Sequence, residues 1–157
     1  MKGKKGASTK AFKMAVEATP DVAQEFKKGL AALGAYSSRI NVSNTLELHG
    51  SVDIDTSTTA KYPNENRWDY VFAYKGEAFF VEVHSAKSSE VRTVLRKLQW
   101  LKDWLHSKAP QIDKLKARNS MPFYWIQSKA FAIPKTAPQY RAAEGAGLKP
   151  ISRLKLN

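Results

Sequence analysis

Two runs of strand-forming residues, separated by a turn signal, constrain the fold of this chain more than any other feature. Residues 68–74 and 78–84 are rich in aromatic and β-branched side chains, and Lys75-Gly76 lies between them. The pattern predicts a tight β-hairpin centred on these two residues. Because the turn is so short, it also fixes which residues of the two strands face each other.

The predicted register brings two carboxylates together. Asp69 faces Glu82 with Cβ atoms roughly 4.5–5.5 Å apart, and His84 follows on the same strand face. Opposed carboxylates repel each other and destabilise a hairpin unless a cation lies nearby. A divalent metal ion bound by oxygen ligands would remove the repulsion, and so would a neighbouring Lys or Arg. The alternative is a pair of carboxylates that are simply solvated at the strand ends.

The composition indicates one folded domain with a polyanionic partner. The chain has 157 residues, of which 43% are hydrophobic, and this suits a single domain with a sizeable core. Its 26 Lys and Arg exceed its 14 Asp and Glu, which gives a net charge of +12. The excess favours nucleic acid as the partner over an acidic membrane surface. The sequence leaves the oligomeric state open, a homodimer included.

The start of the chain is strongly basic. Residues 1–13 carry five lysines, among them Lys4 and Lys5, together with Gly and Ser. This composition predicts a flexible basic arm that contacts nucleic acid, followed by a single domain over residues 14–157. No signal-peptide core, no run of about 18 apolar residues and no cysteine occurs. We therefore expect a soluble, cytoplasmic protein without disulfides or thiolate metal sites.

Hydrophobic periodicity and turn residues predict an α/β order of elements, with helices covering a sheet. The long helix has an apolar face, and Arg92, Arg96 and Lys97 lie on its other face. That basic face is either a solvated surface or a phosphate-binding one. Besides the hairpin, the expected elements are a helix over 19–34, a strand over 46–55 with a bulge at Gly50, a loop over 56–66, a helix over 89–107, a strand over 122–127, a helix over 139–146 and an edge strand over 151–156.

This order of elements resembles the restriction-endonuclease-like fold, in which helices flank a mixed central sheet with an αβββαβ core. In that superfamily, the PD-(D/E)XK nucleases, an Asp begins the second core strand and a (D/E)-X-K tripeptide ends the third, before a long helix. Asp69 and Glu82-Val83-His84 stand in those places. Trp68 stands where the motif has proline, and His84 replaces the motif lysine.

The resemblance implies a site for Mg²⁺ or Mn²⁺. Asp69 and Glu82 would ligate the metal ion, with the Val83 carbonyl as a third oxygen ligand. His84 would orient or deprotonate the attacking water, or in its protonated form stabilise the developing charge.

Two more groups belong to the implied site. Lys87, just before the long helix, is the candidate for the cation lost with the motif lysine. The upstream acid found in many members of the superfamily would be Glu25 or Glu47. The resulting prediction is a metal-dependent nuclease that hydrolyses phosphodiester bonds, with DNA favoured over RNA as the substrate. The alternatives are a non-catalytic nucleic-acid-binding protein on the same fold and a subunit of a larger assembly.

Overall fold

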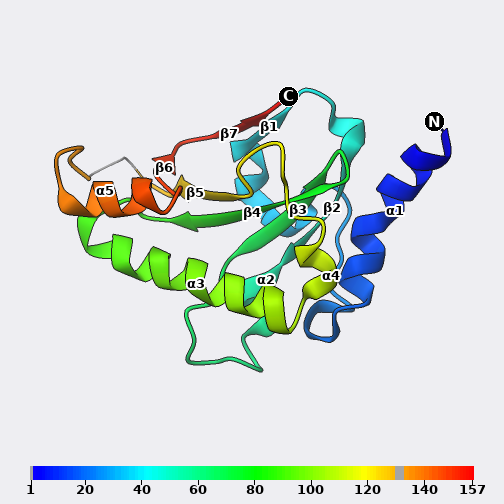
Figure 1. The fold of residues 1–157 in the computed structure, drawn as a ribbon, viewed down its shortest axis with the longest axis horizontal. Coiled ribbons are helices and arrows are strands. Elements are labelled where there is room, and N and C mark those ends of the chain that lie inside the picture. The colour runs from blue at the N-terminus through cyan, green and yellow to red at the C-terminus, as the bar shows by residue number, and fades with distance from the viewer. Residues whose placement is uncertain (1, 130–132) are drawn as a thin grey trace.

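A mixed sheet forms the centre of the structure. The computed structural model describes residues 2–129 and 133–157, with side chains from residue 9 onward. The sheet strands are β2 (Leu48–Asp53), β3 (Tyr70–Tyr74), β4 (Glu77–His84), β5 (Phe123–Gln127) and β6 (Pro150–Ile151). They form a five-stranded sheet in this order, in which β2 to β4 are antiparallel and β4 to β6 are parallel (Figure 1). The prediction of a mixed sheet in an α/β fold is confirmed.

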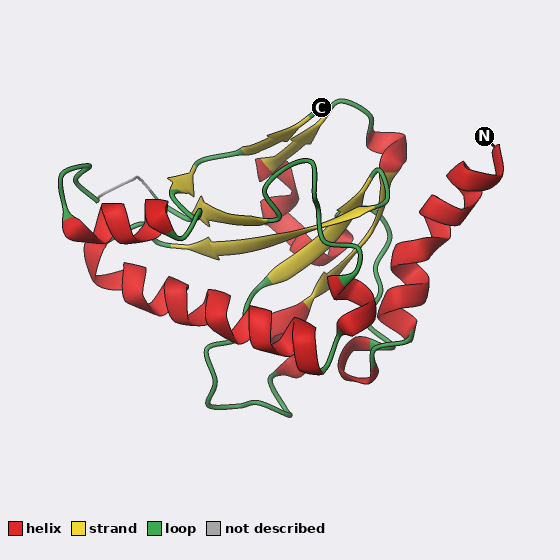
Figure 2. Ribbon diagram, viewed as in Figure 1, coloured by secondary structure: helices red, strands yellow, loops and turns green. Residues whose placement is uncertain are grey.

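The two faces of the sheet are covered differently. Buried residues of the helices α1 (Lys2–Glu17), α3 (Val91–Ser107), α4 (Pro110–Asp113) and α5 (Pro138–Gly145) pack in the larger core cluster, on one face. The other face carries the 3₁₀ segment η2 (Ala31–Arg39) and a small parallel sheet of β1 (Ile40–Val42) and β7 (Leu154–Leu156). Figure 2 shows α3, the longest of the described helices, running along the sheet. No described helix combines the length and the apolar character needed to cross a membrane.

The hairpin forms in the predicted register. Tyr70 pairs with Val81 and Tyr74 with Glu77. Lys75 and Gly76 both have positive φ, 52° and 82°, as the tight turn between two twisted strands requires. The turn sequence therefore sets the pairing that brings Asp69 to Glu82.

The long helix is also confirmed, and the alternation of β4 determines what faces it. A short 3₁₀ turn, η4 (Ser88–Glu90), leads into α3. The α3 residues Val91, Val94, Leu98, Leu101, Trp104 and Leu105 are buried. Phe80 of β4 packs in the same cluster as this stripe, whereas Phe79 and Val81 pack on the opposite face. Because side chains alternate along a strand, Glu82 and His84 share the face of Phe80 and point toward α3.

The helix expected over 19–34 does not form. That stretch contains only the 3₁₀ turn η1 (Pro20–Val22) and the start of η2. Between them Lys27 bridges Ser51 of β2, with backbone N–H to O distances of 2.9 and 2.8 Å in the two directions. Gly50 permits this approach, because a Cβ there would lie 2.2 Å from the Phe26 ring. Long-range pairing thus replaces the local helical pattern.

Other boundaries also differ from the sequence predictions. The boundary expected after residue 13 falls inside α1, whose Phe12, Ala15 and Val16 are buried. The side chains of Lys4 and Lys5 lie outside the described part of the chain. The region 45–58 contains η3 (Thr45–Glu47), β2 with a register shift at Gly50, and α2 (Ile54–Thr58), which replaces the expected end of the strand and the start of the expected loop. The single edge strand expected over 151–156 is divided between β6 and β7, which pair with β5 and β1.

Candidate active site

Asp69 and Glu82 meet where the hairpin strands end. Asp69 lies just before β3, and its backbone N–H donates to Glu82 Oε1 at 3.1 Å. In return the Val83 N–H donates to Asp69 Oδ2 at 2.9 Å. The carboxylate therefore replaces the backbone carbonyl of a neighbouring strand as the acceptor. None of the Glu82 side chain is exposed, and 16% of Asp69 is. Each carboxylate therefore holds the backbone with one oxygen and keeps a second oxygen for another partner.

That partner is Lys97 of α3. Its Nζ lies 2.5 Å from Glu82 Oε2 and 3.8 Å from Asp69 Oδ1. From the sequence, Lys97 was expected with Arg92 and Arg96 on the outer face of α3, whereas only 15% of its side chain is exposed in the structure. The positive charge of Lys97 thus compensates the repulsion between the opposed carboxylates. A neighbouring Lys or Arg was one of the two compensating partners expected from the sequence, the other being a metal ion.

The position of Lys97 in α3 explains why it turns inward. It follows Val94 by three residues and precedes Leu101 by four, and both are fully buried. Residues three and four apart lie on one helix face, so Lys97 flanks the apolar stripe. Its long stem lies along the core while its ammonium group reaches the carboxylates. This spacing is the sequence signal that could have identified it.

Burial and the nearby charges shift the pKa values of Asp69 and Lys97. Burial raises the pKa of Asp69 to about 7, and the charge of Glu82 adds to the shift, although Lys97 acts against it. Burial alone would lower the pKa of Lys97, but Glu82 and Asp69 outweigh burial and raise it. One ammonium group therefore compensates two carboxylates only in part.

His84 lies between the Glu82 carboxylate and a further one, that of Glu90. Its Nδ1 is 3.4 Å from Glu82 Oε2, and its Nε2 is 2.8 Å from Glu90 Oε1. The contact with Glu82 raises the pKa of His84 against the effect of burial, and Glu90 adds to the rise. These contacts favour the imidazolium form of His84. Glu90 was missed by the sequence analysis, because it stands outside the hairpin motif.

The other expected site residues have different surroundings. Lys87 is exposed before η4. Glu25 is exposed, and Glu47 lies at the turn end of the hairpin, where its carbonyl accepts from the Lys75 N–H and its carboxylate lies 3.2 Å from His49 Nε2.

The acid that the structure does place beside Asp69 is Asp55 of α2. The Asp55 N–H donates to the Asp69 carbonyl at 3.3 Å, and its Oδ1 accepts from Arg67 Nε at 2.7 Å. The charge of Asp55 contributes to the raised pKa of Asp69. Asp55 lies in the segment expected to be a strand end followed by a loop, so no local pattern indicated its position.

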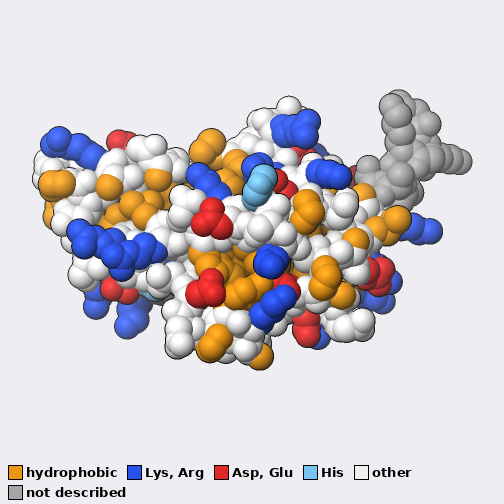
Figure 3. All heavy atoms as spheres, turned by 60° about the horizontal axis from the view of Figure 1, so that its bottom comes forward, with side chains coloured by type: hydrophobic (Ala, Val, Ile, Leu, Met, Phe, Trp, Pro, Cys, Tyr) orange, Lys and Arg blue, Asp and Glu red, His pale blue; other side chains and the backbone are white. Residues whose placement is uncertain are grey.

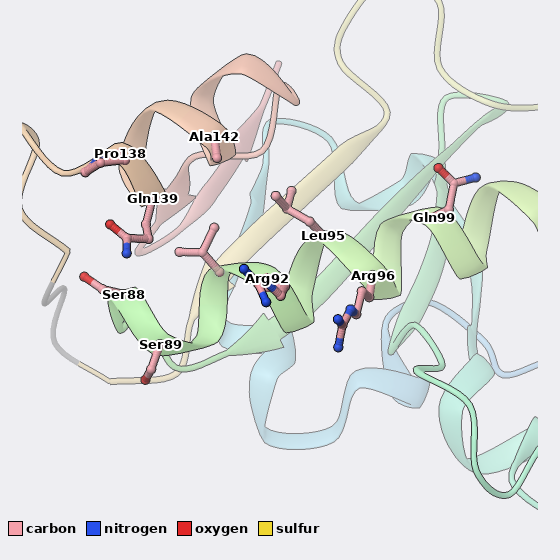
Figure 4. Close-up of a pocket in the computed structure, with 10 residues that line it drawn as sticks. Ser88, Ser89, Arg92, Leu95, Arg96, Gln99, Pro138, Gln139 and Ala142 are labelled. Carbon is pink, nitrogen blue, oxygen red and sulfur yellow. The ribbon is translucent and has the colours of Figure 1, made fainter.

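Arg92 and Arg96 line a groove between α3 and α5. The groove has a volume of about 660 Å³, with an apolar part formed by Val91, Leu95, Pro138 and Ala142. Arg92 and Arg96 extend from the same side of α3, and Ser88 lies opposite Gln139 (Figure 4). Figure 3 shows basic side chains beside hydrophobic surface at the end of the molecule where α3 begins. Asp69 and Glu82 do not line this groove.

The residues at the end of the hairpin fit a hard metal ion by their chemistry. No group of three or more His, Cys, Asp or Glu side chains within the described ranges is arranged to hold one. Mg²⁺, however, is commonly bound through only one or two carboxylates, completed by waters and substrate phosphate. Asp69 and Glu82 supply two carboxylates, and the Val83 carbonyl points to the β3 side because its N–H does.

Comparison of the chain with models of protein families, with curated proteins and with solved structures found no match. The chemistry of the site therefore rests on the residues themselves.

Proposed function

We propose that this protein is a metal-dependent nuclease of the PD-(D/E)XK type, in which Lys97 supplies the cation that the motif lacks at His84. The observation that carries the proposal is the contact of Lys97 Nζ with Glu82 Oε2 at 2.5 Å, beside the Asp69 carboxylate. The tripeptide Glu82-Val83-His84 ends β4, and the long helix α3 follows it. The mixed sheet and the element order from the hairpin to β5 are compatible with the restriction-endonuclease-like fold.

The protein groups have distinct roles in this proposal. Asp69 and Glu82, with the Val83 carbonyl, would hold Mg²⁺ or Mn²⁺, which when bound polarises a phosphoryl oxygen and lowers the pKa of a water molecule. Lys97 orients the carboxylates and neutralises charge that develops on the phosphate. His84, held between Glu82 and Glu90, acts as a second cation rather than as a neutral base.

Access to the site is narrow but present. Between 15% and 20% of the Lys97, Asp69 and His84 side chains is exposed, whereas Glu82 is fully buried. In this proposal the exposed parts of Asp69, Lys97 and His84 meet the phosphate, while Glu82 acts from behind them.

The test of this proposal is cleavage of nucleic acid by the purified protein. Supercoiled DNA, linear duplex, single-stranded DNA and RNA are incubated with Mg²⁺, Mn²⁺ or EDTA. We expect cleavage with a metal ion and none in EDTA. Cleavage that is undiminished in EDTA would rule out the metal-dependent mechanism.

A second function, nucleic-acid binding without catalysis, is favoured by one feature of the site. Lys97 forms a short ion pair with the carboxylate that would hold the metal ion, and such a closed pair also serves as a purely structural link. Under this alternative the protein binds nucleic acid through its positive charge and cleaves no substrate with any metal ion.

Both functions predict that Arg92 and Arg96 contribute to binding. Replacing both by Gln should lower DNA affinity by about tenfold at moderate salt. The slope of log affinity against log salt concentration should become less steep by the amount that about two phosphate contacts contribute. The assay is fluorescence anisotropy with a labelled oligonucleotide in EDTA, over a range of salt concentrations. The charge-matched control is K108Q/R118Q, two exposed residues located after α3 and near the start of β4. Equal affinity of the two variants would remove the groove from the binding surface.

A further inference from the structure

A second cationic cavity lies on the molecule, outside the site and the groove described above. Arg39 at the end of η2, Lys129 after β5 and Arg153 after β6 line a cavity of about 340 Å³. Gln127 and Ser152 complete its lining, and no Asp or Glu of the described ranges takes part. Three positive side chains therefore converge on a polar space without a compensating carboxylate.

The two arginines are held in place by backbone carbonyls. Arg39 Nη1 donates to the Gln127 carbonyl at 2.8 Å and to the Ser152 carbonyl at 3.2 Å. Arg153 Nη1 donates to the Ser38 carbonyl at 2.8 Å. A guanidinium group has five N–H donors, so each arginine retains donors for a ligand. Because their partners are neutral carbonyls, both positive charges are available to an anion.

The cavity lies at the same end of the sheet as the candidate active site. Gln127, which lines the cavity, pairs with His84 in the register of β4 and β5. Ser152 directly follows β6, the next strand of the sheet. Neighbouring strands are about 4.8 Å apart, so Gln127 lies one strand spacing from His84, whereas Arg39 and Arg153 come from segments on the face opposite α3.

We propose that the cavity formed by Arg39, Lys129 and Arg153 binds a backbone phosphate of the nucleic-acid substrate, outside the linkage that lies at Asp69 and Glu82. The inference rests on the proposed function for its active site and adds a phosphate subsite that fixes the strand. A phosphate is the ligand that suits converging arginine donors and a lysine in a polar cavity. The three cations come from three separate segments, and the ends of β5 and β6 hold them together.

The experiment replaces Lys129 and Arg153 by Gln and leaves Arg39, which joins η2 to the ends of β5 and β6, unchanged. Binding of a labelled DNA oligonucleotide is measured in EDTA, where no metal-dependent cleavage occurs, at several salt concentrations. We expect K129Q/R153Q to bind about tenfold more weakly. The slope of log affinity against log salt concentration should be less steep by the amount that about two phosphate contacts contribute. The K108Q/R118Q control should bind like the wild type. If the double variant does not fold, Lys129→Gln alone supplies the same test, because Lys129 is exposed. Its effect on the slope of log affinity against log salt concentration should be about half as large.

The outcomes separate this inference from the proposed function. Equal binding by K129Q/R153Q and its control would overturn the phosphate subsite, even if the wild type cleaves DNA. Weakened binding by K129Q/R153Q alone would support the subsite, even if the wild type cleaves nothing. Inorganic phosphate, added at constant ionic strength, distinguishes a free anion from a strand. Thermal stabilisation of the wild type by phosphate, with unchanged DNA binding in the double variant, would overturn the assignment to a nucleic-acid strand.

Discussion

Replacing Lys97 by methionine is expected to lower the free energy of unfolding by about 3–5 kcal/mol at pH 8, because the buried Glu82 carboxylate loses the closer of its two cationic partners, Lys97 and His84. Methionine keeps the apolar stem and the helix propensity of lysine, so the ammonium group is the main loss. Glu82, which is fully buried, would keep its backbone contact with Asp69 but lose Lys97. Urea unfolding followed by circular dichroism in EDTA measures the change.

The matched control for this variant is Lys102→Met, one and a half turns further along α3. Lys102 is exposed, and its Nζ lies 5.6 Å from the centre of the Phe123 ring. Its replacement should cost less than about 1 kcal/mol. Adding Asp69→Asn to Lys97→Met should recover part of the lost stability, since it removes one of the two negative charges that Lys97 compensates. Equal costs for the Lys97 and Lys102 variants would show that the buried ion pair does not form.

Replacing Asp69 by asparagine is expected to stabilise the protein by about 2–4 kcal/mol at pH 8, because each unit of pKa shift corresponds to about 1.4 kcal/mol. The pKa of Asp69 is raised from 3.8 to about 7, chiefly by burial and by the charge of Glu82, so the folded state binds a proton that the unfolded state releases. The contribution of Asp69 to stability is therefore present below about pH 4 and is lost as the pH rises to about 7. Asparagine avoids this loss, and its side-chain oxygen can still accept from the Val83 N–H.

The measurement is urea unfolding of both proteins between pH 4 and pH 8 in EDTA. The difference in unfolding free energy should be small at pH 4 and should reach its full size near pH 8. Asp103→Asn, an exposed change on α3 that removes the same charge, should stay within about 0.5 kcal/mol of the wild type at pH 8. An Asp69 variant that is less stable than the wild type at pH 8 would contradict the account of the buried carboxylates.

The parts of the fold that the sequence predicted depend on local signals. Lys75-Gly76 and the flanking β-formers determine the hairpin register, so the meeting of Asp69 and Glu82 follows from neighbouring residues. The stripe on α3 is equally local. The segment 19–34 differs, because its helical pattern is replaced by the contact of Lys27 with Ser51, which no local pattern contains.

The site itself was predictable only in part, for a related reason. Lys97 lies fifteen residues beyond Glu82, and its direction depends on how α3 packs on the sheet. The helix pattern alone places Lys97 beside the apolar stripe of α3. A side chain in that position can point either to solvent or to the core. Lys87 was the nearer cation in sequence, yet it precedes the turn that orients α3 and stays exposed. Glu90 and Asp55 reach His84 and Asp69 through the same tertiary packing.

The rate of DNA cleavage by Asp69→Asn, measured beside the wild type and Asp103→Asn with Mg²⁺ and with EDTA, tests the central claim most directly. The Asp69 variant is expected to be folded and more stable, so a loss of activity cannot be ascribed to unfolding. We expect the wild type and Asp103→Asn to cleave DNA with Mg²⁺ only, and Asp69→Asn to be slower by about a hundredfold or more, since it loses a metal ligand. Cleavage by Asp69→Asn at the wild-type rate, or no cleavage by the folded wild type with either Mg²⁺ or Mn²⁺, would contradict the assignment of Asp69, Glu82 and Lys97 as a nuclease active site.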